Sequence, residues 1–187
     1  MKKIISILVC GLFVCSSFAQ DMAKVEPVQF RINFLTPGAE VEFGVTKNST
    51  ILLNAGFLWG IGSSEDFNGN IETNFAILPI IDGQYRYYYN LKQREEKGKN
   101  ISKNSGNFIA LKGTYYFTKS FLEDLEGNEE DLFTDESDLS VIGLAYGIQR
   151  TYFDWLHIGF EGGIGYGQTR TDNVILPILS FTIGYAF

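Results

Sequence analysis

The stretch Ile175-Leu-Pro-Ile-Leu-Ser-Phe-Thr-Ile-Gly-Tyr-Ala-Phe187 alternates large apolar side chains with small or polar ones. The apolar positions are Leu179, Phe181, Ile183, Tyr185 and Phe187, and the positions between them are Ser180, Thr182, Gly184 and Ala186. Because successive side chains of a β-strand point to opposite faces, this pattern predicts a strand with one apolar face. A half-buried strand of a soluble β-sandwich has the same pattern, so the surroundings of the strand stay open at this point.

The same alternation recurs along the chain, and helical periodicity is hard to find after the first residues. Breaks rich in Gly, Pro, Asn, Asp and Ser separate the alternating segments. The candidate strands are residues 28–35, 39–46, 50–62, 75–91, 107–119, 139–151, 155–168 and 174–187. The sequence therefore predicts eight strands, although Pro37-Gly38 leaves open whether 28–46 is one strand or two.

The two faces of these strands differ in a way that favours a membrane barrel. The apolar faces are long, whereas the opposite faces carry glycines and a few charges of both signs. The inward charges expected from the alternation are Arg31, Glu40, Glu42, Asp82, Arg86, Lys112 and Glu161. A soluble sandwich would present many more Lys and Glu to water. We therefore predict an all-β fold, an eight-stranded antiparallel up-and-down transmembrane β-barrel, whose inward charges pair with one another in a narrow lumen.

The first residues have the three parts of a secretory signal. Lys2 and Lys3 are basic, residues 4–15 are apolar, and Ser17-Phe18-Ala19 supplies small residues for cleavage. The apolar run is shorter than the roughly 20 residues of a membrane-spanning helix, which argues against an uncleaved anchor. We expect a signal peptide at 1–19 and an outer-membrane barrel at 20–187.

Composition excludes several kinds of chemistry from residues 20–187. Both cysteines, Cys10 and Cys15, lie in the predicted signal, which excludes disulfides and thiol catalysis from the barrel. Without Lys2 and Lys3, 13 of the 15 basic residues remain against 22 acidic ones. The chain has no basic patch, so nucleic-acid binding is disfavoured.

The acidic excess is concentrated in residues 120–138, which hold nine acidic residues and no basic one. Within this segment, Glu126, Glu129, Glu130 and Asp131 form a weak candidate for Ca²⁺ binding, because clustered carboxylates supply oxygen ligands. The spacing of a known calcium loop is absent, so a solvated surface loop is the favoured interpretation. We expect no metal and no cofactor.

Strand parity places the connections on two sides. With both barrel ends on the periplasmic side, residues 63–73, 120–138 and 169–173 face the cell exterior. Residues 47–49 and 152–154 are then short periplasmic turns. Residues 92–106 do not fit, because they form a long connection where short turns are usual.

The sequence resembles the small outer-membrane β-barrel proteins of the Bacteroidetes type. The resemblance rests on the terminal strand and on segments that mark architecture without carrying chemistry. These segments are Ile32-Asn-Phe-Leu-Thr-Pro-Gly38, Gln84-Tyr-Arg-Tyr-Tyr-Tyr-Asn90, Gly98-Lys-Asn100, Asn104-Ser-Gly-Asn-Phe-Ile-Ala-Leu111 and Tyr146-Gly-Ile-Gln-Arg-Thr-Tyr152. It implies that Phe181, Ile183, Tyr185 and Phe187 form the signal read by the outer-membrane assembly machinery.

The expected function is that of a non-enzymatic outer-membrane protein with a side-chain-filled lumen and a structural or surface-interaction role. The only histidine, His157, is expected to be a solvated interfacial residue, since no serine follows it as in lipid A-modifying barrels. Two alternatives stay open: a narrow porin-like pore for ions or small solutes, and a periplasmic lipocalin-like binding barrel. The expected partners are the lipid bilayer and the assembly machinery, and an extracellular partner is not identified.

Overall fold

The structure, a computed structural model, describes residues 25–65, 71–117, 139–168 and 173–187. The predicted signal peptide at 1–19 and the whole acidic segment 120–138 lie outside these residues. The strands are β1 (Val28–Asn33), β2 (Gly38–Gly44), β3 (Ser49–Glu65), β4 (Ile71–Tyr88), β5 (Asn107–Tyr116), β6 (Leu139–Tyr152), β7 (Leu156–Gln168) and β8 (Asn173–Ala186).

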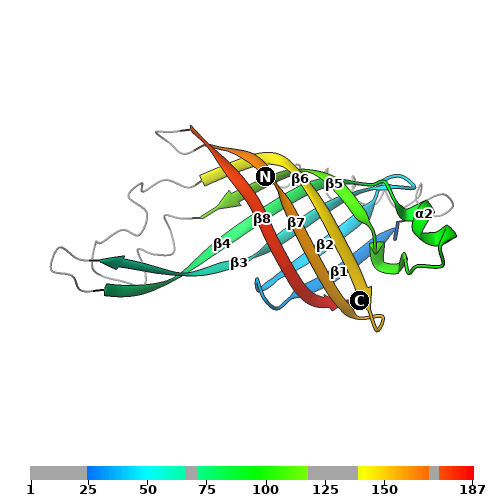
Figure 1. Cartoon of the computed structure of the whole chain (residues 1–187), viewed down its shortest axis with the longest axis horizontal. Coiled ribbons are helices and arrows are strands. Elements are labelled where there is room, and N and C mark those ends of the chain that lie inside the picture. The colour runs from blue at the N-terminus through cyan, green and yellow to red at the C-terminus, as the bar shows by residue number, and fades with distance from the viewer. Residues whose placement is uncertain (1–24, 66–70, 118–138, 169–172) are drawn as a thin grey trace, which may run out of the picture.

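Each strand pairs antiparallel with the next in sequence, and β8 returns to pair with β1. The sheet is therefore a closed barrel, which confirms the prediction of eight antiparallel strands in up-and-down order (Figure 1). The join between β1 and β8 is short, because its register covers only Arg31–Asn33 on β1. By contrast, β3 is paired with β4 along all of Ser49–Glu65.

The structure corrects or completes the strand prediction in two places. Residues 28–46 form two strands, because the chain turns between Asn33 and Gly38 and the two strands pair with each other. The break predicted at 63–73 is shorter than expected, since β3 and β4 stay paired up to Glu65 and Ile71. This hairpin extends beyond the neighbouring strands in Figure 1.

The alternation of side chains separates the barrel into an apolar outside and a largely polar inside. On β1, Phe30 and Ile32 are exposed on the outside, whereas Gln29, Arg31 and Asn33 are buried inside. Large apolar side chains such as Leu53, Ile109 and Leu144 cover the outer surface of other strands. No described part of the chain covers these outer side chains, so they are in contact with the medium around the barrel.

The barrel has two different ends. One end, here called the plugged end, carries residues 45–48, 89–106 and 153–155. The other end, here called the loop end, carries the turn 34–37 and the strand ends that flank 66–70, 118–138 and 169–172. In Figure 1, α2 (Leu91–Glu96) and the C-terminus lie toward the plugged end.

The long connection at residues 92–106 is partly helical. It contains most of α2 and a 3-10 helix, η1 (Ser102–Asn104). Neither helix in the described residues is long and apolar enough to cross a membrane.

Candidate functional site

A first charge cluster lies inside the barrel on β1 and β2. The guanidinium of Arg31 donates from Nη1 to Glu40 Oε2 at 2.9 Å and from Nη2 to Glu42 Oε2. Glu42 also accepts hydrogen bonds from Thr50 Oγ1 and Tyr88 OH, both at 2.6 Å, on its other oxygen. Because the cluster is buried, these bonds compensate for the lost hydration of the charges.

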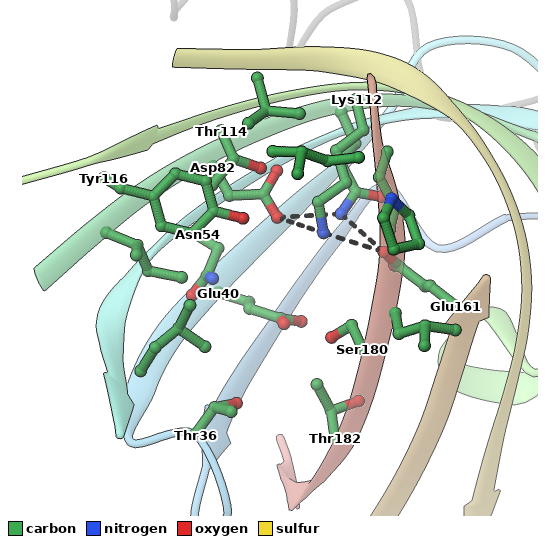
Figure 2. A pocket seen from close by; sticks show the side chains of 18 of the residues that line it. Thr36, Glu40, Asn54, Asp82, Lys112, Thr114, Tyr116, Glu161, Ser180 and Thr182 are labelled. Carbon is green, nitrogen blue, oxygen red and sulfur yellow. Dashed lines mark hydrogen bonds and ion pairs between the residues drawn. The ribbon is translucent and has the colours of Figure 1, made fainter. Parts of the chain in front are cut away.

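A second charge cluster lies on β4, β5 and β7. Arg86 pairs with Glu161 at 2.5 Å, and Lys112 bridges Asp82 at 2.9 Å and Glu161 at 3.0 Å. The amide of Gln84 donates to the same two carboxylates. Figure 2 shows these contacts as dashed lines between Asp82, Lys112 and Glu161. The cluster joins strands from opposite parts of the ring across the lumen.

The structure thus places all seven inward charges named from the sequence in these two clusters. The second cluster balances, since Arg86 and Lys112 face Asp82 and Glu161. The first does not balance, because Glu40 and Glu42 share the single cation of Arg31. The two clusters together therefore carry one more carboxylate than they have cations.

Apolar side chains fill the interior toward the plugged end. Tyr88 and Phe108 pack with ring centroids 5.3 Å apart, and the guanidinium of Arg86 lies 4.3 Å from the centre of the Phe108 ring. On β6, Gly147 leaves room for that ring, because a Cβ there would overlap Phe108. The rest of this buried group is Val25, Leu91 and Ala110, with Ile101 packed against it. These apolar side chains had no signal in the sequence, because alternation alone assigns inward positions of a membrane barrel to polar residues.

Residues 97–106, which follow α2, close the plugged end by hydrogen bonds to four separate parts of the barrel. Asn104 accepts from the backbone of Glu26 at 2.7 Å, and its carbonyl accepts from Gln149 Nε2 at 2.8 Å. Lys103 Nζ donates to the carbonyls of Asp154 and Ala186. The segment is consequently tied to the approach to β1, to β6, to the β6–β7 turn and to β8.

A cavity of about 140 Å³ lies between the second charge cluster and the loop end. Glu40, Asn54, Asp82, Lys112 and Glu161 are among its lining residues (Figure 2). Apolar side chains line it nearer the strand ends, namely Leu58, Ile80, Leu139 and Leu176. The interior is therefore filled toward one end and hollow toward the other.

His157 is placed differently from the expectation. The sequence predicts a solvated interfacial residue, but the side chain of His157 points into the barrel and is only 2% exposed. Its Nδ1 has no hydrogen-bond partner. The reason is its register: His157 pairs across β6–β7 with Thr151, an inward position. The alternation along β7 begins at its first residue, Leu156, which belongs to the apolar outer face. The next residue, His157, therefore falls on the inner face.

The residues of the predicted assembly signal lie on β8 and immediately after it. Phe181, Tyr185 and Phe187 are exposed on the outer surface, and the Tyr185 ring packs between Trp155 and Phe187. Their role in assembly stays a prediction. The weak Ca²⁺ candidate residues, Glu126 to Asp131, lie outside the described residues. Within the part of the chain that is described, no group of three or more His, Cys, Asp or Glu residues is arranged to hold a metal ion.

Comparison of the chain with protein-family models, with curated proteins and with solved structures gives no match.

Proposed function

We propose that the protein is a transmembrane β-barrel of a bacterial outer membrane, closed to solute flow, with a structural or surface-interaction role. The observation that carries this proposal is the belt of large apolar side chains on the outside of the barrel. Seven of the eight strands present at least one such exposed side chain, and β2 contributes the half-buried Val41 and Phe43. In water such a belt would be a large unpaired apolar surface, which folded soluble proteins avoid.

The strand lengths support a bilayer as the surrounding medium. A tilted strand needs about 9–11 residues to cross the hydrocarbon core. The strands β6, β7 and β8 have 14, 13 and 14 residues. The strands β1 and β2 are shorter, with 6 and 7 residues, but exposed Phe34, Leu35 and Val45 extend the apolar surface beyond them.

Aromatic side chains gather where the outer surface approaches the plugged end. Tyr89 and Tyr146 share a hydrogen bond of 3.0 Å between their hydroxyls, and Asn107 donates to both. The stacked rings of Trp155 and Tyr185 lie at the same end. Amphipathic rings at this level are typical of the girdle at a membrane–water interface.

The filled interior supports a barrel that does not conduct. The second charge cluster crosses the lumen, and the packed Tyr88 and Phe108 lie between it and the plugged end. Among the described residues, no serine is hydrogen-bonded to Nδ1 of His157. The surface at the loop end therefore remains the part through which such a protein would act.

The location is tested by fractionating cells that express the protein and running the membrane fraction unheated and boiled on a denaturing gel. We expect recovery in the outer-membrane fraction and a band whose migration changes on boiling, because closed barrels resist detergent until heated. Recovery in the soluble periplasm would instead support a lipocalin-like barrel and overturn the proposal.

Closure is tested by conductance across a planar lipid bilayer. We expect no steady openings from the wild-type protein. A double variant, Tyr88→Ala with Phe108→Ala, removes the packed rings and serves to show that the inserted barrel is detectable when opened. Steady wild-type openings that vanish when Glu42 and Arg86 are replaced would establish the pore alternative.

A further inference from the structure

The cavity near the loop end has buried acceptors without donors. Asp82 is 4% exposed and lines the cavity, and its Oδ1 has no hydrogen-bond partner, although Oδ2 is bonded to Lys112. Asn54, also in the lining, has an Oδ1 atom that is equally buried and equally without a partner. A buried acceptor left unbonded is costly, so the cavity favours an occupant that donates hydrogen bonds.

Strand register brings these acceptors together. Glu40 pairs with Asn54 across β2–β3, and Asn54 pairs with Asp82 across β3–β4. The three side chains are therefore neighbours on the inner face, and Figure 2 shows them along one side of the cavity. Neighbouring cross-strand side chains lie about 5 Å apart at Cβ, close enough for one small group to meet more than one of them.

The charge around the cavity favours a cation. The nearby cations Arg86 and Lys112 are already paired with Glu161 and Asp82. Glu40 belongs to the cluster in which two carboxylates share Arg31, so the unbalanced negative charge lies at the cavity wall. An anionic ligand would meet this charge without a free cation to compensate it.

The shape of the lining favours an organic cation over a metal ion. The described residues hold no group of three or more His, Cys, Asp or Glu with metal-binding geometry. Instead, Leu58, Ile80 and Leu139 form apolar walls beside the polar row. A short aliphatic chain fits against such walls, while an ammonium group supplies N–H donors to the acceptors.

We propose that this cavity binds a small primary alkylammonium compound, with its ammonium group against Glu40, Asn54 and Asp82 and its carbon chain along the apolar walls. The proposal does not depend on which membrane or compartment holds the barrel. It therefore succeeds or fails separately from the proposed function.

The test is titration calorimetry on the purified protein, folded in an uncharged detergent at low salt. The probes are n-butylammonium chloride and n-butanol, which have similar carbon chains but differ in charge. We expect saturable binding of butylammonium and binding of butanol at least about tenfold weaker, because hydrogen bonds between charged partners are the stronger ones. Absence of saturable butylammonium binding, or equal binding of the two probes, would overturn the proposal.

Variants then locate the site. Asn54→Leu removes one unpartnered oxygen at nearly constant size, and Glu40→Gln removes the unbalanced charge, so each is expected to weaken butylammonium binding about tenfold. The matched control is Thr151→Val, which removes another unpartnered buried oxygen on the inner face but near the plugged end. Binding should be unchanged in this control. If Asn54→Leu does not fold, Glu40→Gln and the comparison of probes decide, and unchanged binding in Glu40→Gln contradicts the proposal.

Discussion

At the scale of single residues, Glu42 shows how the barrel tolerates charge in its interior. Its carboxylate is fully buried and accepts from Arg31, Thr50 and Tyr88, which come from three different strands. A buried carboxylate with such partners is stable only as part of the set. Neutralising it leaves the guanidinium of Arg31 with Glu40 as its remaining ionic partner.

Glu42→Gln is therefore expected to lower the free energy of unfolding by about 1–3 kcal/mol, because Arg31, Thr50 and Tyr88 lose a charged acceptor while Arg31 keeps its ion pair with Glu40. The measurement is urea unfolding of the protein inserted in lipid vesicles, followed by tryptophan fluorescence. Glu96→Gln is the control, because the ion pair of Glu96 with Lys92 is long, at 3.9 Å, and exposed. This control should change the stability by no more than about 0.5 kcal/mol. Equal effects of the two substitutions would show that the buried cluster does not hold the barrel together.

At the scale of elements, the strands could be predicted from the sequence, but the conformation of residues 91–105, here called the plug, could not. Alternation between apolar and small or polar residues repeats over ten or more positions in strands such as β6 and β8, and it fixes both the strand and its faces. In α2 the helix has only 6 residues and Leu91 is its only buried one, too little for a helical period to show. The segment after α2 is held by bonds to distant parts of the chain, such as the one between Asn104 of η1 and Glu26, which a local pattern does not contain.

The same limit applies to the candidate site. Alternation identified the seven inward charges, because each lies on a regular strand. Which of them pair depends on the stagger between strands, so that Glu161 of β7 meets Arg86 of β4 across the lumen. The cavity follows from side-chain volumes on several strands at once, and no single segment of the sequence records it.

Substitutions of Asn104 test whether this residue holds the plug in place. It is buried in a left-handed conformation, with φ of 59°, and its side chain accepts from Glu26. Asn104→Ala loses the bond and strains the backbone, whereas Asn104→Gly loses the bond but keeps the conformation. We expect amide hydrogen exchange in residues 91–105 to accelerate in both variants and more strongly in the alanine variant. Unchanged exchange in both would mean that Asn104 does not hold the plug.

At the scale of the whole molecule, the medium around the barrel decides what an outward charge costs. Leu144 lies near the middle of β6 and is 59% exposed on the outer surface. In a bilayer, Leu144→Arg should destabilise the inserted barrel by about 2–4 kcal/mol, because arginine at the membrane midplane is poorly solvated. In water the same change would have little effect. The measurement is urea unfolding from lipid vesicles.

The control for this prediction is Phe153→Arg, at an exposed side chain in the β6–β7 turn of the plugged end. There the arginine reaches water, so we expect a change well below that of Leu144→Arg. A Leu144→Arg variant as stable as its control would argue that the apolar belt does not lie in lipid.

The short join between β1 and β8 has a consequence for the folding pathway. Ile32 and Tyr185 are register partners from the first and last strands, whereas every other strand pair is adjacent in sequence. Pairing β1 with β8 closes a loop that contains all the other strands, which carries a large entropic cost. The join that forms is only a few residues long. Hairpins such as β3–β4 have the opposite balance, with a short loop and a long register. The rate-limiting step is therefore expected to be ring closure, with a transition state in which the hairpins are formed and the two outer strands are still apart.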